Sequence, residues 1–262
     1  MASVFQISWK KASHHHITDY VTFLLDTSDL APATIRSRIS AIAFYYKTRL
    51  NCDPTKSFAT DLLLKHLEKS SQNRKRLPIN KDILEKLLLS LYSYKSKFLF
   101  HAFYLMYKIM YSLALRISEL LHYSKKFDHA LRYKDIKQLG NVVWITIRSG
   151  KHNIRPMKYS LDSSFRFLWH LKEFLRLRGS AQGPLFCFKN GKPITRNFFT
   201  RQLKEDLCSL GLHSTRYNSH SFRIDRTSDL ALQGASDRQI ALIGRWQSDA
   251  FRDYIRPTHI AL

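Results

Sequence analysis

Apolar residues recur with the period of an α-helix along most of this 262-residue chain, and one segment departs from that period. Within residues 35–46, three isoleucines and a tyrosine are spaced 4, 3 and 4 residues apart, which places them on one helical face. Residues 142–147 are instead β-branched and aromatic, which is typical of a strand. Helices and strands do not alternate along the chain, so the sequence argues against a doubly wound parallel sheet.

The other predicted elements follow from apolar spacing and from capping residues. Ser149-Gly150 supplies a turn after the strand, and residues 151–161 are predicted to return as a second, antiparallel strand. Further helices are predicted at residues 58–67, 80–92, 97–113, from 116, at 164–177, 195–210 and 220–234, and after Ser236. With only 8 glycines, a turn-dense all-β protein is disfavoured. The expected fold is mainly α with a small antiparallel β-sheet.

A polar, basic stretch at residues 70–78 interrupts the helical periodicity and closes with Pro78. We interpret it as an interdomain linker, although a long surface loop within one domain is the alternative. The expected organisation is a helical domain at 1–72, a basic linker at 73–79 and a second domain at 80–262. Arg74, Lys75 and Arg76 of this linker could lie along a phosphate backbone.

The charge of the chain indicates a polyanionic partner. The sequence has 43 Lys and Arg against 20 Asp and Glu, a formal net charge of +23. No stretch approaches the roughly 18–20 apolar residues of a membrane span, and no apolar signal core opens the chain. Nucleic acid is therefore favoured over a membrane. Arg36 and Lys47 share one face of the helix predicted around residues 35–46. This face either contacts phosphates or is simply solvated.

Cysteine and histidine usage gives no metal site. Cys52, Cys187 and Cys208 have no metal-ligand spacing, and their odd number does not form a disulfide framework. A reducing intracellular compartment is the simplest interpretation. His14–His16 could suggest a metal site, but no carboxylate or cysteine accompanies them. A solvated helix entry, or residues foreign to the protein, is favoured, and no metal is expected.

The last third of the chain combines groups suited to phosphodiester chemistry. His220 and Arg223 are three residues apart and share a helical face, and Tyr254 follows some thirty residues later. Phosphoryl transfer needs a nucleophile, stabilisation of developing negative charge and a proton for the leaving oxygen. A free tyrosine has a pKa of about 10 and is almost entirely protonated at neutral pH. Nearby cations lower the free-energy cost of forming its phenolate. Arginine suits this task because its planar fork pairs with phosphate oxygens.

Four blocks of the sequence occur in the order and at the intervals of a known family. The blocks are Leu115–Leu120, Lys151 in the predicted turn, His220–Arg223, and Ile243–Arg256. They resemble the first-arginine segment, the mobile lysine, the His-x-x-Arg box and the nucleophile box of tyrosine recombinases. The N-terminal helices resemble the SAM-like core-binding domain of this integrase-type family. The Gly-Arg-Trp version of the last block is most similar to eukaryotic mobile-element recombinases of the DIRS and Crypton type.

The resemblance implies a type IB cut-and-rejoin reaction on double-stranded DNA. Tyr254 would attack the scissile phosphate, making a 3′-phosphotyrosyl link and freeing a 5′-hydroxyl. Arg116 and Arg223 would hold the non-bridging oxygens, and Lys151 would protonate the leaving oxygen. His220 would assist proton transfer or donate a hydrogen bond.

The same resemblance assigns supporting roles. Trp246 would donate its indole N–H toward phosphate, and Glu119 would orient the site from behind, holding a cation. The covalent link conserves the bond energy, so no cofactor or metal is implied. Self-association into a synaptic tetramer on DNA is expected, with a nuclear location if the host is eukaryotic.

Three departures from the family pattern leave alternatives open. Trp246 precedes Tyr254 by eight residues, whereas Arg245 has the more usual spacing of nine, so either could enter the site. Asp225-Arg226 stands where relatives carry small residues. This charge pair is either packed within the fold or exposed to solvent. Only eight residues follow Tyr254, which leaves the mode of assembly open, as well as whether the chain is a fragment or a domesticated relic.

Two rival functions remain at this point. One is a DNA-binding protein without catalysis, derived from a mobile element. The other is a topoisomerase or telomere resolvase that uses the same chemistry. Retention of a nucleophile argues against the first, and the recombinase-like N-terminal helices argue against the second.

Overall fold

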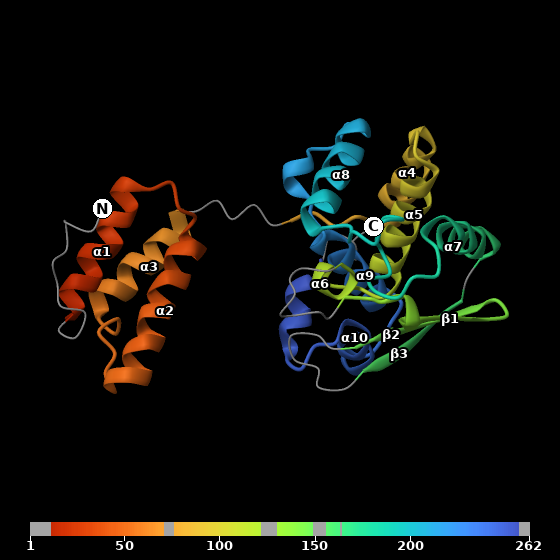
Figure 1. Ribbon diagram of the computed structural model, residues 1–262. Helices are drawn as coiled ribbons and strands as arrows, with labels where there is room; N and C mark the ends of the chain where they lie inside the picture. Colours follow the sequence, from red (N-terminus) through yellow and green to blue (C-terminus); the bar gives the residue numbers. More distant parts are fainter. Residues whose placement is uncertain (1–11, 71–75, 122–129, 149–155, 163, 257–262) are drawn as a thin grey trace. The chain divides into compact units, whose positions relative to one another are not determined.

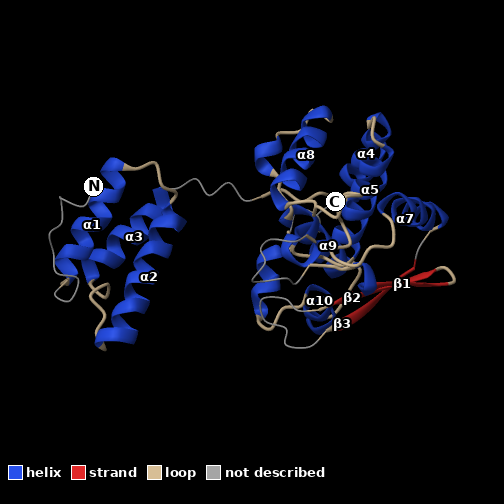
Figure 2. Ribbon diagram, in the orientation of Figure 1, coloured by secondary structure: helices blue, strands red, loops and turns tan. Residues whose placement is uncertain are grey.

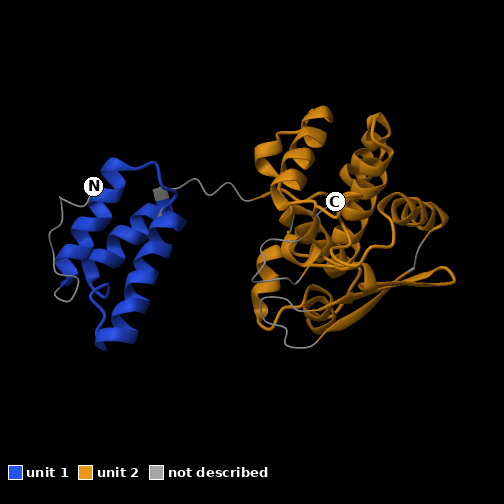
Figure 3. Cartoon of the chain, in the orientation of Figure 1, with its two compact units in different colours: residues 1–74 blue, residues 75–262 orange. Residues whose placement is uncertain are grey.

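The computed structural model describes residues 12–70, 76–121, 130–148, 156–162 and 164–256. The chain divides into two compact units, residues 1–74 and residues 75–262 (Figure 3). Its described part is mostly helical with one small sheet, which confirms the predicted fold class (Figure 2). No helix in these ranges combines the length and the apolar character needed to cross a membrane.

The first unit is built from three helices, α1 (His14–Thr27), α2 (Pro32–Leu50) and α3 (Phe58–Ser70) (Figure 1). The predicted apolar face of α2 is confirmed, because Ile35, Ile39 and Tyr46 are all buried. Pro32 begins α2, where a missing backbone N–H removes no helical hydrogen bond. The buried apolar residues of the small core are Ile17, Val21, Leu24, Ile35, Ile39, Leu64 and Leu67.

The histidine run at the start of the chain begins α1 and shows no metal-binding arrangement. The Nδ1 atom of His16 accepts a hydrogen bond from the Ser13 backbone N–H at 3.0 Å, which caps the helix. Among the residues that the structure describes, no group of three or more His, Cys, Asp or Glu side chains could hold a metal ion.

The second unit is organised around α5 (Lys97–Ser112), which is buried along most of its length. The helices around it are α4 (Lys81–Ser90), α6 (Ile117–Leu120), α7 (Phe165–Arg178), α8 (Arg196–Ser209), α9 (His220–Leu232) and α10 (Asp237–Gly244). The described part of the unit also contains the 3₁₀ turns η2 (Leu91–Ser93), η3 (Tyr133–Asp135), η4 (Ser214–Arg216) and η5 (Asp249–Tyr254).

Capping side chains fix where these helices begin. Asn80, Ser164, Thr195 and Ser236 each accept a hydrogen bond from a backbone N–H in the first turn of α4, α7, α8 and α10. These predicted helix starts are therefore confirmed. The contacts of α5 with α7 and α9 bring the centre of the chain against its C-terminal third (Figure 1).

The sheet has three antiparallel strands in the order β1 (Ile136–Leu139), β2 (Val142–Ile147) and β3 (Met157–Asp162). The sequence predicts β2 and a partner strand from residue 151, of which 151–155 lie outside the described residues. It does not predict β1, because three of its four residues are exposed and leave no apolar alternation. The missed signal is Gly140-Asn141 between two strand segments, a two-residue turn with Gly140 at φ +56°.

The segment predicted as a linker is partly built into the second unit. The backbone N–H groups of Leu77 and Ile79 donate to the carbonyl oxygens of Arg216 and Ser221, at 2.9 and 3.1 Å. Ile79 is completely buried. Residues 76–79 therefore belong structurally to the second unit, where they lie against the beginning of α9.

Candidate active site

The first predicted arginine lies in a tight turn between α5 and α6. Ala114 there has a φ of +45°, which costs a residue with a Cβ about 1–2 kcal/mol. Arg116 precedes α6, and its backbone N–H donates to Glu119 Oε2 at 2.8 Å. Its Nη1 atom also contacts Glu119 Oε1 at 3.2 Å, while its side chain stays partly exposed. The turn therefore presents one cation at the surface above a buried carboxylate.

Arg245 is buried beneath this turn and is saturated with acceptors. Its Nη2 and Nε atoms donate to the two carboxylate oxygens of Glu119, at 2.9 and 3.2 Å. The remaining N–H groups donate to the carbonyl oxygens of Leu113, Ala114 and Ile243. Burial by itself would raise the pKa of Glu119, but the charge of Arg245 and the bonds from both arginines hold that pKa below its ordinary value. Arg245 thus fixes the Arg116 turn to the end of α10.

Arg223 in α9 is equally buried but lacks a carboxylate partner among the described residues. Its side chain is 0% exposed, and it donates to the carbonyl oxygens of Ala114 and Gly244 at 2.7 and 2.6 Å. Its Nε atom is buried without a hydrogen-bond partner in the described structure. Burial, followed by the charges of Arg116 and Arg245, lowers the pKa of Arg223 to about 9. Only two of its five N–H groups are used in the described structure, and the Nε–H is among those left for an anion.

Trp246 covers that guanidinium, and Tyr254 lies next to both. The Arg223 guanidinium carbon lies 3.7 Å from the centroid of the indole and 5.5 Å from that of the Tyr254 ring. The two rings are 5.2 Å apart. A Cβ atom on Gly244 would lie 1.5 Å from the indole, so only glycine lets Trp246 fold back over the end of α10. The Gly-Arg-Trp motif thus directs Arg245 inward and Trp246 over the site.

His220 begins α9 and faces the tyrosine. The centroids of its ring and the Tyr254 ring are 6.5 Å apart, and its Nδ1 atom is buried with no hydrogen-bond partner in the described ranges. Burial, then the charges of Arg223, Arg116 and Arg196, lower the pKa of His220 below its ordinary value. The imidazole is therefore neutral at physiological pH and can accept a proton.

The turn that carries Tyr254 is attached to the same helix. Ser228 Oγ lies 3.2 Å from the Tyr254 carbonyl oxygen and accepts the Arg256 backbone N–H at 3.0 Å. Because Ser228 and His220 are both on α9, one rigid helix positions the nucleophile candidate and the histidine together.

Six of the predicted site residues are brought together: Arg116, Glu119, His220, Arg223, Trp246 and Tyr254. Lys151 lies outside the described residues. The alternative between Arg245 and Trp246 has a structural outcome, because Trp246 lies beside Tyr254 whereas Arg245 lies beneath with Glu119.

The predicted DNA contacts occupy both units. Arg36 and Lys47 are exposed on α2 of the first unit, where Lys47 Nζ also pairs with Asp53 at 2.9 Å. Arg74 and Lys75 lie outside the described residues. The Nη1 atom of Arg76 donates to the Thr215 carbonyl oxygen, which holds this side chain against the second unit.

A basic face of α8 was missed by the sequence analysis. Arg196, Arg201 and Lys204 line a shallow hollow together with Asn197 and Thr200. The charge of Arg196 acts on His220, which places the start of this face near the candidate site. The signal was available in the sequence, because the spacing of Arg196, Arg201 and Lys204 places all three on one side of the predicted helix.

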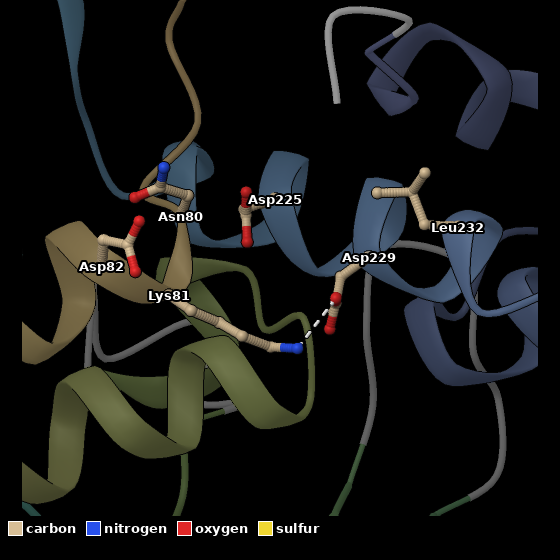
Figure 4. Close-up of a pocket in the computed structure, with 6 residues that line it drawn as sticks. All are labelled: Asn80, Lys81, Asp82, Asp225, Asp229 and Leu232. Atoms are coloured by element: carbon tan, nitrogen blue, oxygen red, sulfur yellow. Dashed lines mark ion pairs between the residues drawn. The ribbon is translucent and has the colours of Figure 1, made fainter. Parts of the chain in front are cut away.

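A second hollow lies on the opposite face of α9 and is acidic (Figure 4). Lys81 Nζ pairs with Asp229 at 3.0 Å, and the Tyr111 hydroxyl donates to the buried Asp225 at 3.0 Å. Asp225 is thus packed rather than exposed, which resolves one departure from the family pattern. The carboxylate of Asp82 adds a further negative charge, so this hollow disfavours a phosphate.

Solved structures with the same fold include the Tn1549 transposon integrase in complex with transposon right end DNA. It is 13% identical with a TM-score of 0.67, covering 95% of this chain and 83% of that one. The XerH site-specific recombinase, in a post-cleavage complex with palindromic difH substrate, is 22% identical with a TM-score of 0.69, covering 95% and 68%. A lambda integrase dimer bound to a COC′ core site is 12% identical with a TM-score of 0.57, covering 95% and 66%.

The comparison of sequences places these similarities in a family. No curated protein matches the chain. The sequence model described as the Phage integrase family matches residues 82–257, which contain all the residues assembled around Tyr254. Because that match spans more than half of the sequence, the chain belongs to the phage integrase family.

Proposed function

We propose that this protein breaks and rejoins DNA strands, in site-specific recombination or transposon integration, with Tyr254 as nucleophile. The observation that carries the proposal is the assembly of Tyr254, His220 and Arg223 on and against one helix, with Arg116 beside them. Membership of the phage integrase family and the DNA complexes of structurally similar recombinases support it.

In the proposed step, the Tyr254 phenol oxygen forms a bond to the scissile phosphorus while the bond from phosphorus to the 5′-oxygen breaks. The neutral His220 takes the phenolic proton, directly or through water, because its lowered pKa leaves the imidazole unprotonated before the step. Lys151 gives a proton to the leaving 5′-oxygen. The product is a 3′-phosphotyrosyl link and a 5′-hydroxyl, and attack by a 5′-hydroxyl reverses the step. No nucleotide cofactor enters this balance.

The two arginines stabilise charge on the phosphate. Arg116 is partly exposed, and Arg223 offers the buried Nε–H that has no partner among the described residues. A buried donor without an acceptor costs about 1–3 kcal/mol, which a phosphate oxygen would relieve. In the arrangement described, Trp246 covers Arg223, so the indole moves aside when the phosphate enters, and its N–H can then serve as a further donor.

We assign the DNA contacts outside the catalytic cluster to basic residues of both units. On α8 these residues are Arg196, Arg201 and Lys204. The linker and α2 carry the others, which are Arg36, Lys47, Arg74, Lys75 and Arg76. Contacts of this kind make affinity steeply salt-dependent. A synaptic tetramer, a relationship with DIRS and Crypton elements, and a nuclear location in a eukaryotic host remain parts of the proposal.

The test is a nicked suicide duplex that carries the end of the protein's own element. After cleavage the short 5′-hydroxyl fragment diffuses away, which traps the covalent adduct for a denaturing gel. We expect an adduct with the wild type and none with Tyr254→Phe. Tyr92→Phe is the matched control, because Tyr92 is exposed in η2 and should not affect the adduct. An adduct that persists in Tyr254→Phe means that another residue is the nucleophile.

A second function is favoured by one observation, the complete burial of Arg223 beneath Trp246. If the indole does not move, the site holds DNA without cutting it, and the protein is a non-catalytic DNA-binding derivative of a mobile element. The same assay separates the two, because that protein retains the nicked duplex on a native gel and gives no adduct on a denaturing one.

A further inference from the structure

The outer face of the three-stranded sheet carries an exposed tryptophan on its central strand. In β2, Val143, Ile145 and Ile147 are buried against the core, and the alternating residues point the other way. Trp144 on that outer side is 40% exposed. A large aromatic ring in the middle of a sheet face is normally covered, so this position presents a ring for contact with a partner.

Lysines surround the ring from three elements. Lys137 of β1 is directly paired with Trp144, and Lys158 of β3 is paired with Thr146 two residues further along β2. Residues in these directly opposed and diagonal positions have Cβ atoms roughly 5–8 Å apart. Lys134, just before β1, completes a hollow that these residues line together with Leu139.

The charge of this hollow is one-sided. Its described lining includes three lysines and no carboxylate, and all three lysines are exposed. The nearby Asp135 is buried and already pairs with Arg148 at 2.8 Å, so it does not neutralise the face. A partner must therefore combine negative charge with an apolar, planar group.

We propose that this face, defined by Lys134, Lys137, Trp144 and Lys158, binds single-stranded nucleic acid, with a base stacked on Trp144 and phosphates held by the lysines. Bases in a duplex are stacked on one another and hide their faces, whereas an unpaired base can stack on an exposed ring. An acidic peptide supplies charge but matches the ring less well.

This surface is separate from the candidate active site. The Tyr159 hydroxyl on the inner side of β3 donates to the Leu242 carbonyl oxygen of α10 at 3.2 Å, which shows that the inner side faces the catalytic elements. The proposal goes beyond the proposed function, which concerns cleavage of duplex DNA, and it requires no catalysis.

The test uses the full chain and a short fluorescein-labelled oligothymidylate, titrated by anisotropy near physiological salt with excess unlabelled duplex to occupy duplex-binding surfaces. Trp144→Ala should weaken binding by about 5- to 100-fold, in line with the loss of one base–aromatic stack. Trp144→Phe should retain most of the affinity. Trp169→Ala removes an exposed tryptophan of α7 outside the hollow and should leave the affinity within about twofold of wild type.

The lysines are tested with a charge-matched pair of variants. Lys137→Gln with Lys158→Gln should weaken oligothymidylate binding by more than tenfold, while Lys86→Gln with Lys172→Gln, exposed on α4 and α7, should weaken it about twofold or less. Circular dichroism and the duplex affinity of each variant establish that it is folded. The proposal is wrong if the wild type does not bind oligothymidylate, if Trp144→Ala binds like Trp169→Ala, or if polyglutamate displaces the oligonucleotide at equal charge concentration.

Discussion

Two buried arginines lie side by side in the candidate site, and they differ in the hydrogen-bond acceptors around them. Arg245 and Arg223 both donate to the carbonyl oxygen of Ala114, at 3.1 and 2.7 Å. Arg245 has both oxygens of Glu119 as well. Arg223 has no such partner among the described residues, and its Nε–H has no acceptor there.

On the proposed function, this difference separates a structural arginine, Arg245, from one that would bind phosphate, Arg223. A buried arginine that is fully paired stabilises the fold around it, and a phosphate would gain little from it. A buried arginine without a carboxylate is held at a cost in folding free energy, because burial and the neighbouring Arg116 and Arg245 disfavour its charged form and lower the pKa of Arg223 to about 9. A bound anion would stabilise the charged guanidinium and remove this cost. The position nine residues before Tyr254, Arg245, is therefore the structural one.

Among the substitutions that test this difference, Arg245→Met should have the largest effect, a loss of folding stability. The substitution removes the buried arginine partner of Glu119 and leaves it only the partly exposed Arg116, and breaking a buried pair in this way typically costs about 3–5 kcal/mol. We expect the free energy of unfolding, measured by urea denaturation, to fall by that amount.

A double variant controls this prediction. Glu119→Gln added to Arg245→Met removes the stranded charge and should recover part of the lost stability, because the two residues are directly coupled. If Arg245→Met is as stable as the wild type, the pair does not hold the Arg116 turn, and the structural role assigned to Arg245 is wrong.

Arg223→Met should instead impair DNA cleavage without lowering the stability of the protein. Covalent-adduct formation on a suicide duplex should slow by about 100- to 1,000-fold, as expected for loss of one preorganised donor to a transition-state oxyanion. The free energy of unfolding should stay unchanged or rise, because a desolvated charge is replaced by an apolar side chain of similar length. Large losses in both stability and duplex affinity would instead make Arg223 a structural residue like Arg245.

The fold was largely predictable because its helices obey local rules. The spacing in α2 and the caps of α4, α7, α8 and α10 are encoded within a few residues of each element. The strand β1 was not predictable from periodicity, because it is an edge strand held by pairing with β2 rather than by burial. Its only local signal is the Gly140-Asn141 turn.

The site was predictable in its members but not in their arrangement. The sequence predicts Trp246 for the site with Arg245 as the alternative, and only the three-dimensional path shows which side chain lies beside Tyr254. Arg245 adopts a left-handed conformation at φ +58°, which ends α10 and turns Trp246 back over Gly244. Non-local contacts of this kind, across more than a hundred residues to Glu119, leave no periodic trace in the sequence.

The smallest expected effect is on the titration of His220, and it distinguishes the two arginines without using catalysis. Burial and the charge of Arg223 lower the pKa of His220, whereas Arg245 is not among the groups that lower it. Arg223→Met should therefore raise this pKa, and Arg245→Met should move it less. The imidazole Cε1–H resonance, assigned by its loss in His220→Gln, reports the value by NMR.

Because the folded pKa is depressed below 6.5, the unfolded chain binds the proton more readily, so the contribution of His220 to stability is present above that pH and is lost as the pH falls through the folded value. A wild-type His220 that titrates at or above 6.5 would contradict both the burial and the cation cluster on which the comparison rests.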